Sequence, residues 1–120
     1  RTVKVFMVEK KEALDNIDEI CSVPGIDMVQ FGPNDFALSS GFNMAENKER
    51  VREAELKMFE AAKKHGVHVR AEMNSVEDAQ YYLDLGVRHF NVGMELRILS
   101  NFWKQQGSQL NEMIRKAGLK

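Results

Sequence analysis

The sequence has 120 residues, a formal net charge of −1, and 43% hydrophobic and 29% charged residues, so we expect one globular domain spanning residues 1–120 with a core of its own. The near-neutral charge offers no basic surface for nucleic acid, and no apolar run reaches the roughly 20 residues of a membrane span, so neither partner is expected. Cys21 is the only cysteine and the start carries no secretory pattern, which predicts a cytoplasmic protein without an internal disulfide. Because the chain begins Arg-Thr-Val, we also expect that further chain precedes it.

Three similar junctions organise the chain. In each, an amphipathic run ends at a glycine, and a valine or isoleucine follows at once; the glycines are Gly25, Gly66 and Gly86. Glycine closes a helix in the left-handed conformation, and β-branched residues favour a strand. The junctions therefore predict three places where a helix passes into a strand.

The predicted elements alternate strictly. Strands are expected at 3–8, 26–31, 67–71 and 88–92, and helices at 11–21, 46–65, from 75 onward, and at about 98–116. Ser75 and Asp78 have the spacing of a capping box, and Gly107-Ser108 is expected to kink or break the last helix. The alternation predicts an α/β fold of four βα units with a parallel sheet. A small open sheet and half of a (βα)₈ barrel, whose whole has about 250 residues, both fit this pattern.

Two acidic residues follow neighbouring strands. Glu9 comes directly after the first strand and Asp35 after the second. In both architectures the carboxyl ends of the strands build the site, so these side chains are expected to face one another. Two facing carboxylates repel, and a divalent cation such as Mg²⁺ relieves that repulsion, with water and substrate oxygens as further ligands. Both residues also fit as solvated acids at helix starts.

The segment Gly32-Pro33-Asn34-Asp35 connects the second strand to a loop expected at 35–45. Glycine lets backbone approach a ligand, proline stiffens the turn, and the amides of Asn34 and Asp35 can face a substrate carboxylate. A plain turn of the same residues is the alternative. The long loop lies on the predicted active face, and long loops are often functional.

A weaker set of candidates lies along the third strand. His68, Arg70 and Glu72 alternate there and so share one face. In a barrel that face is the interior, with Glu72 near the active end. A solvated or salt-bridged set is the alternative.

Several spacings recur together. They are Val5 to Glu9 with Ala13 four residues on, V-P-G-I-D at 23–27, G-P-N-D-F at 32–36 with S-x-G at 39–41, and L-G-V-R-H-F-N-V-G at 85–93. This combination resembles the HpcH/HpaI aldolase family, which is related to citrate lyase β-subunits. The resemblance runs through the whole chain.

The resemblance implies the C-terminal half of a (βα)₈ TIM-type barrel and a class II pyruvate aldolase, a carbon–carbon lyase. Such an enzyme cleaves 4-hydroxy-2-oxo acids to pyruvate and an aldehyde through a metal-stabilised enolate. It implies Mg²⁺, Mn²⁺ or Co²⁺ on Glu9 and Asp35, and a 2-oxo acid held by Gly32, Pro33, Asn34 and Asp35. It also implies a homo-oligomer. The family's catalytic His and Arg belong to the first half, so these 120 residues alone are expected to be incomplete.

The chain departs from the family at three positions. Met7, Lys10 and Phe36 stand where the family often has Gln, Thr and Leu, which leaves the substrate open. A malyl- or citryl-CoA-type lyase of the same superfamily is one alternative. A non-catalytic flavodoxin- or receiver-like α/β module is another, although no Gly-rich phosphate loop follows the first strand.

Overall fold

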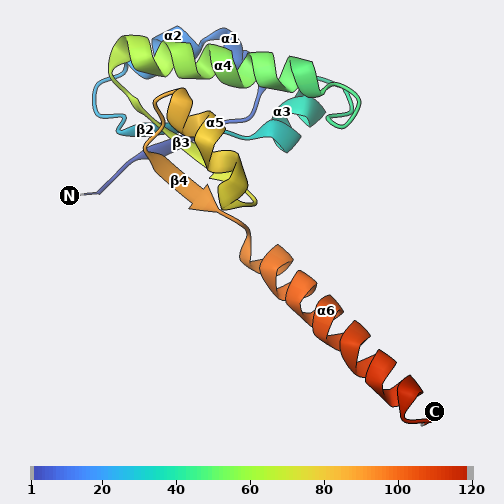
Figure 1. Ribbon diagram of the computed structural model, residues 1–120. Coiled ribbons are helices and arrows are strands. Elements are labelled where there is room, and N and C mark those ends of the chain that lie inside the picture. The colour runs from blue at the N-terminus through green and yellow to red at the C-terminus, as the bar shows by residue number, and fades with distance from the viewer. Residues whose placement is uncertain (1, 119–120) are drawn as a thin grey trace.

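The computed structural model describes residues 2–118 and contains one parallel four-stranded sheet (Figure 1). The strands, in their order across the sheet, are β1 (Val5–Val8), β2 (Met28–Phe31), β3 (His68–Met73) and β4 (His89–Val92). The helical elements are α1 (Lys11–Asp15), α2 (Ile17–Ser22), α3 (Pro33–Ser39), α4 (Lys48–His65), η1 (Val76–Asp78), α5 (Ala79–Asp84) and α6 (Glu95–Lys116). The α/β class with four βα units is thus confirmed.

One face of the sheet carries the core. Val29, Phe31 and Ala71 point to this face and are almost fully buried. Helix α4 covers them with small and flexible side chains, among them Met58 and Ala62, which are both 0% exposed. Figure 1 shows α4 with α1 and α2 on the same side of the strands. Small residues let the helix approach the sheet closely, so the two layers form one densely packed core.

Within residues 2–118, no helix layer covers the opposite face of the sheet. Met7 is half exposed and Glu72 is exposed, whereas their neighbours Val8, Ala71 and Met73 on the core face are buried. His68, Arg70 and Glu72 share this face, as their alternation predicts. Each strand pairs with the next in sequence, without the reversal of order that open doubly wound sheets show. Sequential order and one-sided helix cover are the features of a barrel wall, and they argue against the flavodoxin- or receiver-like alternative.

The three junction glycines behave as predicted. Gly25, Gly66 and Gly86 have φ values of +90°, +68° and +89°. An L-residue with a side chain rarely adopts this region, so glycine is required where each helix turns into the next strand. At the end of α4, the Gly66 N–H donates to the Lys63 carbonyl at 3.3 Å.

Several boundaries differ from the prediction. The first helix is divided at Asn16, whose side-chain amide donates to the Glu12 carbonyl at 2.9 Å and competes with the helix ladder. Ser75 caps a 3₁₀ turn by accepting from the Glu77 N–H at 3.2 Å. The expected break at Gly107-Ser108 was wrong, because α6 runs through it without interruption.

Helix α6 projects away from the rest of the molecule (Figure 1). None of its described residues is buried. Along residues 2–118, no helix combines the length and the apolarity that crossing a membrane requires.

Candidate active site

The C-terminal ends of β1 and β2 meet at one edge of the sheet, and the predicted residues lie there. Val8 pairs with Phe31, so Glu9 and Gly32 follow side by side. The Gly32 N–H donates to the Val8 carbonyl at 2.9 Å. A Cβ atom added to Gly32 would lie 2.9 Å from the Glu9 Cβ and 3.3 Å from its Oε2. The Glu9 side chain therefore lies directly over the Gly32 backbone, in space that a side chain at position 32 would occupy.

Asp35 is carried by the first turn of α3 and not by an irregular loop, so the loop predicted at 35–45 was wrong over residues 35–39. Pro33 opens the helix, where its missing N–H costs nothing. The first intrahelical hydrogen bond runs from the Phe36 N–H to the Gly32 carbonyl at 2.9 Å. The amides of Asn34 and Asp35 thus come before the helix's own hydrogen bonding begins. Both residues are exposed at this edge.

Ser39 links the end of α3 to the segment that follows β1, a contact that the sequence did not predict. Its hydroxyl lies 3.3 Å from the Glu9 carbonyl and 3.0 Å from the Phe36 carbonyl, and it accepts from the Lys11 N–H at 3.3 Å. The backbone that follows the Glu9 side chain, from the Glu9 carbonyl to the Lys11 N–H, is therefore tied to the helix that carries Asp35. The signal available in the sequence was the S-x-G spacing after G-P-N-D, which names the residue but not its partners.

The donor set at this edge suits a hard divalent cation. Glu9 and Asp35 supply carboxylate oxygens, the ligands that Mg²⁺ prefers. Within residues 2–118 there is no group of three or more His, Cys, Asp or Glu side chains that could hold a metal ion. A cation bound here would complete its shell from water, substrate or residues beyond this segment, which is the usual pattern for Mg²⁺. That the two carboxylates converge on one ion stays a prediction.

The three histidines lie elsewhere. His65 ends α4 and pairs with Asp18 at 2.9 Å. Hydrogen bonds from Lys64 and then His65 hold the pKa of Asp18 below its usual value. His68 and His89 begin β3 and β4, and their ring centroids are 5.0 Å apart in an edge-to-face contact. A general base must come within hydrogen-bond reach of the proton it removes, and none of these rings lies at the edge that carries Glu9.

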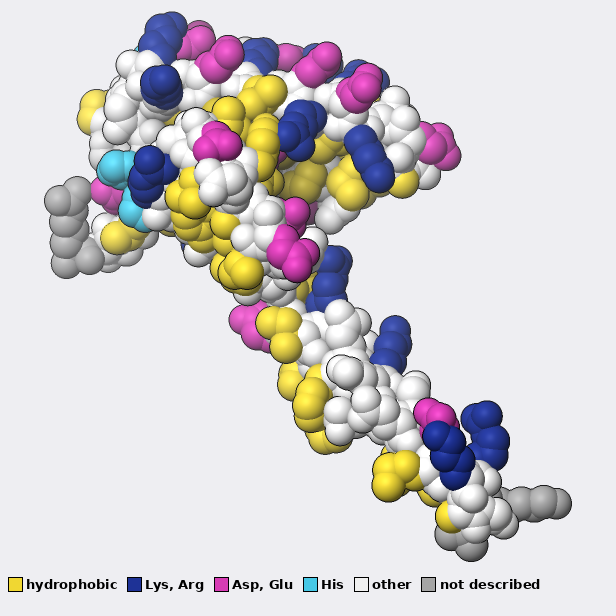
Figure 2. Space-filling view, in the orientation of Figure 1, with side chains coloured by type: hydrophobic (Ala, Val, Ile, Leu, Met, Phe, Trp, Pro, Cys, Tyr) yellow, Lys and Arg dark blue, Asp and Glu magenta, His cyan; other side chains and the backbone are white. Residues whose placement is uncertain are grey.

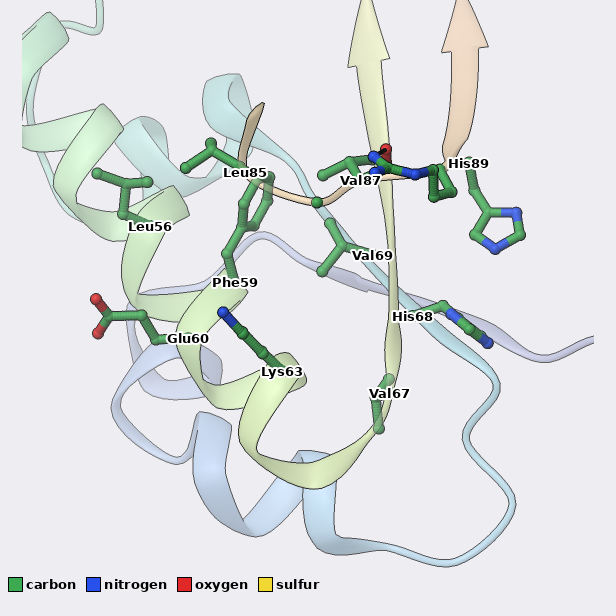
Figure 3. Close-up of a pocket in the computed structure, with 12 residues that line it drawn as sticks. Leu56, Phe59, Glu60, Lys63, Val67, His68, Val69, Leu85, Val87 and His89 are labelled. Atoms are coloured by element: carbon green, nitrogen blue, oxygen red, sulfur yellow. Dashed lines mark hydrogen bonds between the residues drawn. The ribbon is translucent and has the colours of Figure 1, made fainter. Parts of the chain in front are cut away.

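A pocket of about 350 Å³ lies at the opposite end of the sheet (Figure 3). It is lined by Phe59 and Lys63 of α4 and by Val67, which directly precedes β3. Figure 3 shows His68 and His89 pointing to the other side of the strands from Phe59. Sites in parallel α/β folds lie at the carboxyl ends of the strands, so this pocket is not the candidate active site.

Comparison with known proteins agrees with this geometry. Residues 1–101 match the sequence pattern of the family described as HpcH/HpaI aldolase/citrate lyase. The chain is 32% identical over 94 residues to a 5-keto-4-deoxy-D-glucarate aldolase of Enterobacter sp. (strain 638), a match over 78% of this chain and 37% of the relative. It is 34% identical over 105 residues to a 2-keto-3-deoxy-L-rhamnonate aldolase of Escherichia coli O6:K15:H31, a match over 85% of this chain and 38% of that protein.

A crystal structure shares the fold. The HpcH/HpaI aldolase from Desulfitobacterium hafniense DCB-2 superposes with a TM-score of 0.82 at 22% identity, over 92% of this chain and 43% of that one. The chain thus spans less than half the length of the proteins it matches, as half of a TIM-type barrel does. The matched family pattern covers most of the chain, and the chain belongs to the HpcH/HpaI aldolase/citrate lyase family.

Proposed function

We propose that the whole protein containing these residues is a metal-dependent aldolase that cleaves 4-hydroxy-2-oxo acids to pyruvate and an aldehyde. The observation that carries the proposal is that the Glu9 side chain lies over Gly32. A hydrogen bond from Ser39 to the Glu9 carbonyl connects this residue to α3, the helix that carries Asp35. The names of the two aldolase relatives support this function over a malyl- or citryl-CoA-type lyase.

Glu9 and Asp35 would hold the cation, Mg²⁺, Mn²⁺ or Co²⁺. When bound, it supplies Lewis-acid stabilisation of the charge that develops on the 2-oxo oxygen of the substrate. Gly32 leaves the backbone at this edge open, and Pro33 fixes the direction in which α3 begins. The amides of Asn34 and Asp35 would donate to the substrate carboxylate and orient it toward the two acidic side chains.

The reaction needs a base that these residues do not supply. The proton of the C4 hydroxyl must leave, the C3–C4 bond must break with its electron pair moving toward the 2-oxo oxygen, and a proton must return to C3 to give pyruvate. The base for the first step lies outside residues 2–118 in this proposal, since the three histidines are remote from the Glu9 edge.

Substitution of the two acids tests the proposal in the whole enzyme. We expect Glu9→Gln and Asp35→Asn each to lower kcat/KM for a 4-hydroxy-2-oxo acid by roughly 100-fold or more, because a Lewis acid contributes several kcal/mol to such steps. Both variants should also bind Mn²⁺ more weakly in a calorimetric titration. Chelation with EDTA should remove activity, and added Mn²⁺ should restore it.

Glu12→Gln is the matched control, since it makes the same chemical change on the exposed side of α1. It should keep both activity and Mn²⁺ affinity. Full turnover in EDTA, or wild-type Mn²⁺ affinity in either Glu9→Gln or Asp35→Asn, would exclude this site as the metal centre.

A further inference from the structure

The bare face of the sheet carries an ordered polar row beside the candidate site. Gln30 is the only polar side chain classed as buried in residues 2–118, at 1% exposed. Its Oε1 accepts from the Arg70 Nε–H, and its Nε2 donates to Glu72 Oε2 at 2.8 Å. A buried amide is costly unless both of its ends are paired, and here both are.

This row fixes the direction of the Glu72 carboxylate. Arg70 can only donate, so the carbonyl end of the Gln30 amide must face it. The NH₂ end of the amide then faces Glu72, because an ionised carboxylate accepts hydrogen bonds and cannot donate them. The arrangement cannot invert without breaking both hydrogen bonds. Glu72 is therefore held at one oxygen, while the side chain as a whole stays exposed.

The strand register places Glu72 close to the candidate site. Gln30 pairs with Arg70, so two residues further along Gly32 stands beside Glu72, as it stands beside Glu9 on its other side. Strands are about 4.8 Å apart, so the backbones at Glu9 and Glu72 are roughly 10 Å apart with only a glycine between them. The Gly32 backbone, which no side chain of its own covers, thus has a carboxylate residue on each side, Glu9 and Glu72.

We propose that Glu72 determines which aldehyde the enzyme accepts, by accepting hydrogen bonds from hydroxyl groups of a neutral, hydroxylated aldehyde and repelling an anionic one. The inference rests on the proposed aldolase function. With pyruvate bound on the side of Glu9 and Asp35, the aldehyde must lie beside it, and the held carboxylate of Glu72 faces that space. Hydrogen bonds to an ionised acceptor are stronger than neutral ones and reward each correctly placed hydroxyl.

A packing role for this row is the competing explanation, because side chains fill the inside of a barrel in layers. Gln30 and Arg70 fit that role. Glu72 differs from them in its position, because it lies beside Gly32 at the carboxyl end of β3 and its side chain is exposed within residues 2–118. A packing residue and a specificity residue respond differently to changes in the aldehyde, and this difference provides the test.

The experiment uses the whole enzyme with Mn²⁺ and pyruvate, and measures kcat/KM for condensation with glyceraldehyde, propanal and glyoxylate. Glyceraldehyde and propanal have the same three carbons and differ by two hydroxyl groups, whereas glyoxylate is anionic. The variants are Glu72→Leu and Glu72→Gln, with Glu60→Gln on the exposed side of α4 as the control. Glu72→Gln keeps an acceptor for Gln30 and so serves where the leucine variant fails to fold.

We expect Glu72→Leu to lower the ratio of kcat/KM for glyceraldehyde to kcat/KM for propanal roughly 10- to 100-fold. Glu72→Gln should lower the same preference less and should raise kcat/KM for glyoxylate relative to glyceraldehyde. The control should keep all three ratios.

Two results would overturn the inference while leaving the proposed function intact in an active wild-type enzyme. One is an unchanged set of ratios in both Glu72 variants. The other is a Glu72→Gln variant that does not fold, which would make Glu72 a packing residue. A wild-type enzyme that condenses pyruvate with none of the three aldehydes would instead overturn the proposed function, and this inference with it.

Discussion

Glu55 is a partly buried carboxyl whose charge affects the stability of this fold. It lies on α4 and accepts from the Tyr82 hydroxyl at 3.4 Å. Burial raises the pKa of Glu55. The positive charge of Arg52 and the hydrogen bond from Tyr82 lower the pKa, but by less than burial raises it. Burial and the neighbouring Glu55 raise the pKa of Tyr82 to about 12, so this phenol stays protonated across the physiological range.

The raised pKa of Glu55 has a consequence for stability. A carboxyl whose pKa is higher in the folded than in the unfolded state binds more protons when folded, so its contribution to stability falls as pH rises from the unfolded pKa of about 4.3 to the folded value. We expect Glu55→Gln to raise the melting temperature of the whole protein at pH 7, and this gain to vanish below about pH 4. Thermal melts followed by circular dichroism measure both. Glu53→Gln, on the exposed side of α4, should show no gain at either pH.

Among the elements, the short helix α3 has the most direct effect on the site. The Ser39 hydroxyl at its end bonds to the Glu9 carbonyl and the Lys11 N–H. The Oγ of the adjacent Ser40, in contrast, is buried with no hydrogen-bond partner among the described residues. We expect Ser39→Ala to weaken Mn²⁺ binding roughly tenfold in the whole enzyme, because groups that orient metal ligands typically contribute that much. Ser40→Ala removes the same atom one residue on and should leave Mn²⁺ affinity unchanged in the same calorimetric titration. Equal affinities for the two variants would show that Ser39 does not position Glu9.

The elements also show what the sequence could predict. The strands and the helix ends at Gly25, Gly66 and Gly86 were predictable, because glycine in the left-handed conformation followed by a β-branched residue is a local signal. Helix α3 was missed because G-P-N-D also fits a turn, although proline at the first helical position was the available cue.

Contacts across the chain were harder to predict. The Ser39 contacts join residues 28 and 30 positions apart, and the Gln30–Glu72 pair spans 42. No local pattern specifies such pairs. The placement of Glu9 and Asp35 at one edge was predictable only because parallel strands paired in sequence order bring their carboxyl ends together.

On the scale of the whole molecule, α6 is the element without a partner in the described chain. Its 22 residues include no buried side chain. The exposed apolar residues along it are Leu96, Ile98, Leu99, Phe102, Trp103, Leu110, Met113 and Ile114. Figure 2 shows hydrophobic side chains along one side of this projecting helix. An exposed apolar stripe of this length is typical of an interaction surface, and we expect a second copy of the protein to cover it, in agreement with the predicted homo-oligomer.

Charge placed on the stripe tests this expectation. Trp103→Glu should convert the whole protein from an oligomer to a monomer in size-exclusion chromatography with light scattering, because a buried tryptophan at an interface typically contributes about 2 kcal/mol or more. Gln105→Glu adds the same side chain about 200° around the helix and should leave the mass unchanged. A wild-type protein that is monomeric at all concentrations, or a Trp103→Glu variant with the mass of the wild-type oligomer, would contradict the interface. If Trp103→Glu dissociates the oligomer while kcat/KM for aldol cleavage is kept, then α6 serves assembly alone, and the site at Glu9 and Asp35 is complete within one barrel.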